Sequence, residues 1–240
     1  MAIARVGTGS GKKNGASVAS VGTAYAPGGT GRLLTISGCV FNSTVTVPTV
    51  ADNTAGAAGT WVVKNQTAAT GTLNVFHAYL ENSGSGITTI TVTGGAGGAF
   101  YAFAIDEWTG VATSASFDQW VHANSDPTAV TSIASGTLTP SGAGALVLGA
   151  GGGIWSTASN PWTTTLGAWT QIISEPDSNA FIGEQSAFQL ASAGVSITWI
   201  NTSSNVQMGT NLVSFLAAGG GGGGGGSGAS QRNQRARARR

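Results

Sequence analysis

Short stretches of alternating apolar and polar residues run through most of the chain. Residues 87–93, ITTITVT, end in a clean alternation that places Ile90 and Val92 on one face and threonines on the other. Residues 195–200, VSITWI, alternate in the same way. A period of two residues is typical of a strand with one face in the core and the other in water. Because no segment shows an apolar stripe of helical period, we predict an all-β protein.

Three further segments are apolar on both faces of a possible strand. They are residues 31–41 (GRLLTISGCVF), 72–80 (TLNVFHAYL) and 99–105 (AFYAFAI). Runs of this kind are typical of strands that are buried on both faces. Clusters of Gly, Asn, Pro and Asp, such as NSGSG, TGGAGG and SEPDSN, separate the segments and favour turns. We therefore predict one β-sandwich domain over residues 18–218.

The two halves of this region resemble each other. The corresponding segments are 31–41 with 144–155, 59–67 with 167–175, 87–93 with 195–201, and 99–108 with 209–218. The offset drifts by a few residues, as expected when turns accept insertions and strands do not. Each pseudo-repeated half contains about four predicted strands, so we expect about eight in total. We predict that they close face to face as a two-sheet antiparallel sandwich of jelly-roll type. Two separate domains are the alternative, but four strands alone bury little apolar surface and no linker separates the halves.

Composition supports a folded β protein. Charged residues make up 8% of the chain, against roughly a quarter in average soluble proteins. Seven Trp and eight Phe, with many aliphatic residues, provide the apolar surface that a disordered chain lacks. The chain contains no run of 18 apolar residues, which a transmembrane helix would require. We therefore expect no membrane partner. The first residues lack the apolar segment of a secretory signal, so we expect a protein that assembles in the cytoplasm.

Both ends of the chain differ from this region. Residues 1–17 are rich in Gly, Ser and Lys without periodicity, which predicts a flexible N-terminal arm. Residues 219–240 begin with eight glycines and continue with a block containing five arginines: Arg232, Arg235, Arg237, Arg239 and Arg240. The rest of the chain has five basic and nine acidic residues, so its net charge is −4 against +5 for the tail. We predict a flexible tether followed by a basic clamp. The clamp binds carboxylates of a neighbouring protein or phosphates of a nucleic acid, and it is the only part of the chain that we consider a candidate for binding nucleic acid.

Few residues are candidates for catalysis or metal binding. His77 lies in an apolar segment, so we expect a packed and hydrogen-bonded side chain. One Cys and two distant His residues do not form a zinc motif. Asp106 and Glu107 are adjacent in a predicted strand, so their side chains should point to opposite faces. We expect no catalytic residue, metal or cofactor.

Tryptophans are the remaining candidates for binding. Trp155, Trp162 and Trp169 cluster in a loop-rich segment, and Trp169 corresponds to Trp61 in the repeat. We expect this corresponding pair to be core residues. Trp155 and Trp162 could stack on sugar rings or anchor contacts between subunits, and we favour the subunit contacts because Trp is enriched in protein interfaces.

One group of proteins shares this order of segments. The order GRLL, VTVP, GTW, VFHAY, ITVT and AFAIDEWTGV, followed by SGAGALVLGAGGG and WT, resembles Gly/Thr-rich structural proteins of tailed-bacteriophage virions. The resemblance covers roughly residues 17–217 and concerns strand order and composition. It implies a small jelly-roll sandwich that serves as a head decoration, fibre or tail accessory module, and it brings no catalytic residue with it.

These observations lead to two functional hypotheses. The first is a non-enzymatic virion structural protein, a capsid decoration or cement protein that forms a homo-oligomer and binds other virion proteins through its loops and terminal extensions. The alternative is a tail-fibre or receptor-binding module that recognises glycans on the host surface. In the first hypothesis the partner-binding residues are the five tail arginines with Trp155 and Trp162.

Overall fold

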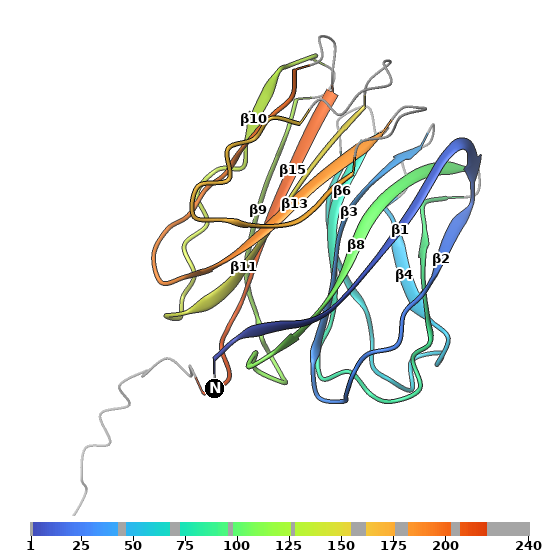
Figure 1. The fold of residues 1–240 in the computed structure, drawn as a ribbon, viewed down its shortest axis with the longest axis vertical. Helices are drawn as coiled ribbons and strands as arrows, with labels where there is room; N and C mark the ends of the chain where they lie inside the picture. Colours follow the sequence, from blue (N-terminus) through green and yellow to red (C-terminus); the bar gives the residue numbers. More distant parts are fainter. Residues whose placement is uncertain are drawn as a thin grey trace, which may run out of the picture.

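The computed structural model describes residues 2–42, 47–67, 73–95, 98–125, 128–154, 162–175, 182–202 and 207–219. These residues contain fifteen strands, which form four antiparallel sheets (Figure 1). No helix in the described ranges is long and apolar enough to cross a membrane. The protein is all-β, as predicted, but it has about twice the expected number of strands.

A five-stranded and a three-stranded sheet make up the first half of the chain. Their strands are β1 (Ala4–Val18), β2 (Ser20–Ala24), β3 (Leu33–Asn42), β4 (Thr49–Asp52), β5 (Val62–Thr67), β6 (Leu73–Leu80), β7 (Thr89–Thr93) and β8 (Ala99–Thr109). The larger sheet has the order β1-β8-β3-β6-β5, and the smaller has the order β2-β7-β4.

The second half repeats this plan. Its strands are β9 (Phe117–Asn124), β10 (Ser132–Ala134), β11 (Ala145–Ile154), β12 (Thr170–Glu175), β13 (Gly183–Ala191), β14 (Thr198–Ile200) and β15 (Gln207–Phe215). The larger sheet has the order β12-β13-β11-β15-β9, and β10 pairs with β14. Read in reverse, this order matches that of the first half: β9 takes the place of β1, β15 of β8, β11 of β3, β13 of β6 and β12 of β5. In place of β4, a single bridge joins Trp162 to Asn201 beside β14. The predicted internal repeat is therefore confirmed by the strand order.

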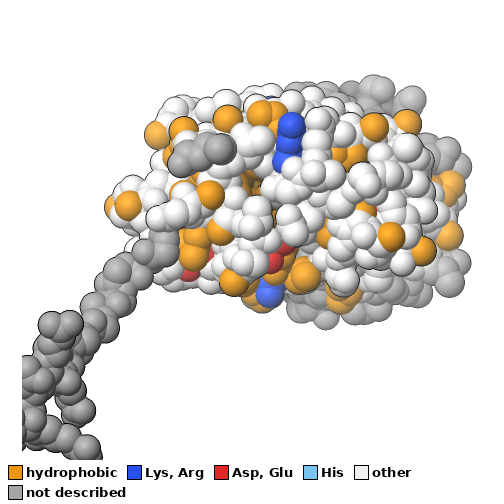
Figure 2. All heavy atoms as spheres, turned by 90° about the horizontal axis from the view of Figure 1, so that it is seen from below, with side chains coloured by type: hydrophobic (Ala, Val, Ile, Leu, Met, Phe, Trp, Pro, Cys, Tyr) orange, Lys and Arg blue, Asp and Glu red, His pale blue; other side chains and the backbone are white. Residues whose placement is uncertain are grey.

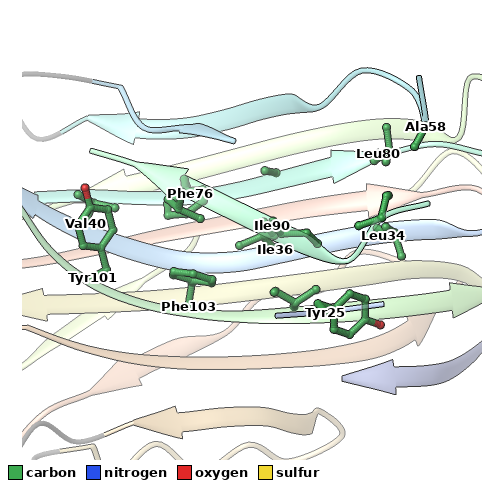
Figure 3. Packing of buried hydrophobic residues seen from close by; sticks show 14 of the residues in the cluster. Tyr25, Leu34, Ile36, Val40, Ala58, Phe76, Leu80, Ile90, Tyr101 and Phe103 are labelled. Carbon is green, nitrogen blue, oxygen red and sulfur yellow. The ribbon is translucent and has the colours of Figure 1, made fainter. Parts of the chain in front are cut away.

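Each half closes into a sandwich of its own. In the first half, Leu34 and Ile36 of β3 are buried against Ile90 of β7 (Figure 3). Leu33 and Cys39 of the same strand belong to clusters on the opposite face of the sheet, together with residues of the second half. The two larger sheets therefore pack back to back between the two smaller sheets. This arrangement of four layers replaces the predicted single sandwich, and it explains why the central strands are apolar on both faces.

Strand β1 replaces the predicted flexible arm. It pairs with the edge of β8 from Ala4 opposite Thr109 to Val18 opposite Ala99. Its composition gave no sign of a strand because glycines occupy the positions that face the first core. The backbone lies close to β8 there: a Cβ atom at Gly11 would lie 2.0 Å from a ring carbon of Phe103. Only glycine fits such an approach.

The packing between the larger sheets is close to twofold symmetric. Cys39 and Gly152 hold the same position in β3 and β11, and they meet: a Cβ atom at Gly152 would lie 2.6 Å from that of Cys39. In an interface between identical subunits, a residue on the twofold axis meets its own copy in this way. The central contact thus resembles that of a homodimer whose subunits are joined in one chain.

Two aromatic contacts support this symmetry. Trp108 packs edge-on against Phe188, with ring centroids 4.9 Å apart and an interplanar angle of 71°. Tyr79 packs edge-on against Phe215 at 5.2 Å and 74°. By the strand registers, Trp108 corresponds to Phe215, and Tyr79 corresponds to Phe188. The two contacts are therefore copies of each other on either side of the central axis.

Candidate functional site

Of the sequence-predicted binding residues, the structure describes Trp162. Its side chain is 7% exposed and packs edge-on against Trp199, with ring centroids 6.5 Å apart. It lies beside β14, where it joins the core of the second sandwich. Trp162 is therefore a core residue here, which corrects its prediction as an anchor for a partner or a sugar. The other predicted positions, Trp155 and the five tail arginines, lie outside the described residues.

Of the two tryptophans expected in the core, Trp169 is found there and Trp61 is not. Trp169 is 8% exposed in the core of the second sandwich, and its Nε1 donates to the backbone oxygen of Ser196 at 3.3 Å. Trp61 is only partly buried against the core of the first sandwich. Its Nε1 donates to Oδ2 of Asp52 at 3.0 Å. The two halves therefore place equivalent tryptophans in different surroundings.

Asp106 and Glu107 point to opposite faces of β8, as predicted. On the face toward the second half, Nε of Arg5 donates to Oδ1 of Asp106 at 2.6 Å. Asp106 is fully buried, and its Oδ2 has no hydrogen-bond partner among the described residues. Burial raises the pKa of Asp106 to about 6, although Arg5 acts in the opposite direction. The ion pair ties the start of β1 to β8.

Glu107 holds a loop on the other face. Nη1 of Arg32 donates to its Oε1 at 2.5 Å. The hydroxyl of Tyr25 at 3.2 Å and the N–H of Gly28 at 3.0 Å donate to Oε2. Burial, followed by the charge of Glu107, raises the pKa of Tyr25. This carboxylate therefore fixes the connection between β2 and β3 rather than facing a ligand.

His77 links the two halves. It is fully buried, with Nε2 at 3.1 Å from the backbone oxygen of Asn211 and Nδ1 at 3.0 Å from Oγ of Ser37. A carbonyl oxygen only accepts, so Nε2 carries the proton and Nδ1 accepts from Ser37. Burial lowers the pKa of His77 to about 4, which keeps the ring neutral at pH 7. The packed and hydrogen-bonded role that the sequence predicted is confirmed.

Other carboxylates hold strand ends. The backbone N–H groups of Ser116 and Phe117 donate to Oε1 of Glu81 at 2.6 and 3.1 Å, which fixes the start of β9. Asp118 accepts from the side chains of Ser141 and Ser214. In the part of the chain that the structure describes, no three His, Cys, Asp or Glu residues are placed to hold a metal ion.

The described surface has small hollows, of which two are formed by residues discussed above or by their neighbours. One, of about 280 Å³, lies between β1 and β12 and includes Arg5 and Ile172. The other, of about 230 Å³, lies beside β4 and is lined by Trp61 and Asp52. Sequence reasoning missed this second site because Trp61 was assigned to the core and Asp52 stood in no motif.

Comparisons of the chain with protein families, curated proteins and solved structures find no match. Apart from those that line a hollow, the polar groups described above connect parts of the same chain.

Proposed function

We propose that this chain is a non-enzymatic structural protein of a tailed-bacteriophage virion, acting as a capsid decoration or cement protein. The observation that carries the proposal is the internal use of its carboxylates. Five of them accept hydrogen bonds from the backbone or side chains of the same chain: Asp52, Glu81, Asp106, Glu107 and Asp118. The described side chains on the face in Figure 2 are mostly uncharged. An uncharged surface can be covered by a partner without desolvating charges, which favours extensive subunit contacts.

The fold agrees with this role. In each half the chain passes back and forth between two sheets. In the first half, the larger sheet contains the order β1-β8-β3-β6, and the smaller sheet has the order β2-β7-β4. We interpret this order as a jelly roll that has been duplicated and joined back to back, with the fifth strand moved to the larger sheet. The sequence resemblance to Gly/Thr-rich virion proteins supports the same reading. Edge strands such as β5 and β12 offer backbone groups for contact with like subunits in a homo-oligomer or with the shell.

The terminal extension supplies the second contact of this proposal. The glycines of residues 219–226 let the chain cross a neighbouring subunit, and the five arginines beyond them bind an acidic surface. Such binding weakens as salt screens the charges. The protein assembles onto particles in the host cytoplasm and remains on the virion.

Microscopy of purified particles tests the proposal. We expect density for this double sandwich at regular positions on the outside of the head, and co-sedimentation of the chain with particles. Deletion of residues 219–240 should leave the sandwiches folded but weaken particle binding, most clearly as salt rises. Replacing the five tail arginines by lysine is the matched control and should retain most binding. A chain that is absent from purified particles would overturn the proposal, and density at the tail tip would favour the receptor-binding alternative.

A further inference from the structure

The hollow beside β4 combines an aromatic wall with a carboxylate. Trp61 and Asp52 line it, with Thr60 at its rim and the small residues Ala55 and Gly56 on the adjoining loop. Its volume of about 230 Å³ is smaller than the roughly 300 to 1,000 Å³ of sites for drug-sized molecules. The hollow therefore suits one small ring rather than an extended ligand.

Trp61 is held in a fixed position. Part of its side chain packs against the core of the first sandwich, and part lines the hollow. Its Nε1 donates to Oδ2 of Asp52 at 3.0 Å, which restricts rotation of the ring. An aromatic surface that is fixed before binding loses little conformational entropy when a ligand stacks on it.

The loop that borders the hollow is also fixed. Oδ1 of Asp52 accepts from the backbone N–H of Thr54 at 2.8 Å, and Oγ1 of Thr54 accepts from the N–H of Ala58 at 3.0 Å. Ala55 has a φ of 53°, in the left-handed region, which costs a non-glycine residue roughly 1 kcal/mol or more. Backbone strain of this kind persists where surrounding contacts impose it. The contacts around Asp52 therefore hold the rim of the hollow in one shape.

The described residues of the second sandwich differ at the equivalent place. Trp169 corresponds to Trp61 but is 8% exposed and donates to a backbone oxygen instead of a carboxylate. The position of β4 is taken by the bridge at Trp162, whose indole packs inside the core. The duplicated fold does not by itself require an open hollow with a carboxylate. In the first half, an aromatic wall and a carboxylate stand together at an open hollow, and this combination points to a ligand.

We propose that this hollow binds a single neutral sugar ring. The apolar C–H face of a pyranose stacks on Trp61, and its hydroxyl groups donate to Asp52 and exchange hydrogen bonds with Thr60. Among the described residues, Oδ2 of Asp52 accepts only the indole N–H of Trp61, so a lone pair remains for a hydroxyl donor. The carboxylate repels phosphate and sulfate groups, which excludes anionic ligands from the hollow.

A sugar suits this site better than an organic cation. Recognition of quaternary ammonium groups uses several aromatic rings around the charge. Here one indole lines the hollow, and three donors from Thr54 and Trp61 already partly neutralise Asp52. The proposed sugar site is independent of the virion role, since it concerns the isolated chain, and either proposal can fail without the other.

Titration of the full chain with a panel of neutral methyl glycosides tests this proposal. We expect weak, saturable binding in the millimolar range that shifts the indole N–H resonance of Trp61 in NMR spectra. Choline chloride is the probe for the cation alternative. Binding of choline without any sugar, or no saturable shift with any glycoside in the panel, would overturn the proposal.

Variants locate the binding to the hollow. Ala51 is exposed at the hollow, so Ala51→Phe should fill it without disturbing the core and weaken sugar binding at least tenfold. Asp52→Asn should weaken binding less, because one acceptor oxygen remains. Trp169→Phe is the matched control in the second sandwich and should leave the affinity unchanged. If Ala51→Phe binds as tightly as the original chain, the sugar lies elsewhere and the inference is wrong.

Discussion

Strands β1 and β9 hold the same edge position in the two sandwiches, but different interactions keep them there. Strand β9 inserts side chains such as Phe117, Trp120 and Val121 among the buried clusters. Strand β1 presents glycines to the first core, and its main side-chain link to β8 is the ion pair of Arg5 with Asp106. Pairing with the backbone edge of β8 or β15 therefore defines the position of the edge strand. The side chains that reinforce this pairing differ between the two halves.

The interface between the sandwiches shows a similar contrast. The aromatic contacts of Trp108 and Phe215 are symmetric, whereas the ionisable groups are not. By the strand registers, Ser186 takes the place of His77, and Val213 takes the place of Asp106. The aromatic packing is therefore similar on both sides of the axis. At the positions of His77 and Asp106, in contrast, a buried titratable group occurs in the first half alone. This difference allows each half to serve as a control for the other.

The largest effect is expected from the symmetric aromatic pair. Trp108→Ala and Phe215→Ala should each lower the free energy of unfolding by about 3 to 5 kcal/mol, because both create a cavity between the sheets. Trp108→Ala should cost about 1 kcal/mol more, since Nε1 of Trp108 donates to Oγ1 of Thr35 at 2.9 Å. Urea denaturation followed by circular dichroism measures both values.

An exposed position provides the control for this experiment. Leu190 is 51% exposed on β13, so Leu190→Ala should change stability by less than about 0.5 kcal/mol. Equal, small losses for all three variants would contradict a packed core between the sandwiches.

The next effect concerns pH, because His77 and Asp106 act in opposite directions. The folded state lowers the pKa of His77 from 6.5 to about 4, so His77 removes stability as pH falls through this window. The folded state raises the pKa of Asp106 from 3.8 to about 6, so Asp106 removes stability as pH rises through this window. Each slope is at most about 1.4 kcal/mol per pH unit, and the two partly cancel between pH 4 and 6.

Substitution by the residues of the second half separates the two slopes. His77→Ser leaves Asp106 and should give a protein whose stability falls as pH rises from 4 to 6. Asp106→Val leaves His77 and should give the opposite slope. Urea denaturation across this range measures them, and the slopes are unaffected by any constant loss from imperfect packing. Curves that run parallel to that of the original chain would show that neither group titrates differently on folding.

The sequence predicted the larger features of this fold for physical reasons. The segments 31–41 and 144–155 were matched because both are long and apolar, and they form the equivalent strands β3 and β11. Strand β1 was missed because inward glycines leave no alternation of side chains to detect. Strands β4 and β10 have only four and three residues and were missed, whereas the equally short β14 was found because the alternation of residues 195–200 extends beyond it.

The candidate site was harder to predict than the fold. Burial of Trp162 depends on a bridge to Asn201, which is distant in sequence. The contact of Trp61 with Asp52 depends on a loop that includes a left-handed alanine, Ala55, and no composition rule predicts that conformation. A residue that is apolar and flanked by turn residues can lie in a core, line a hollow or face solvent. Only the tertiary structure distinguishes these environments.

A moderate effect is expected at the centre of the symmetric interface. Gly152→Ala places a Cβ atom too close to Cys39 and should cost about 1 to 3 kcal/mol. Cys39→Gly should relieve this overlap, so the double variant should lose less stability than the sum of the two single variants. A double-mutant cycle of unfolding free energies measures the coupling. Simple additivity would mean that these two positions do not meet.

The smallest effect concerns the local stability of the two edge strands. Amide hydrogens of β1 should exchange faster than those of β9, because fewer side chains must separate when β1 opens. Arg5→Ala should increase exchange in the first half of β1 further, and more at pH 7 than at pH 5. Below the raised pKa of Asp106, that carboxyl is mostly protonated in the original chain and the ion pair contributes little. Thr8→Ala, at an exposed position on the same strand, should have little effect at either pH. Equal protection of β1 and β9 would mean that backbone pairing alone holds an edge strand in this fold, and that the side chains of β9 add nothing to its attachment.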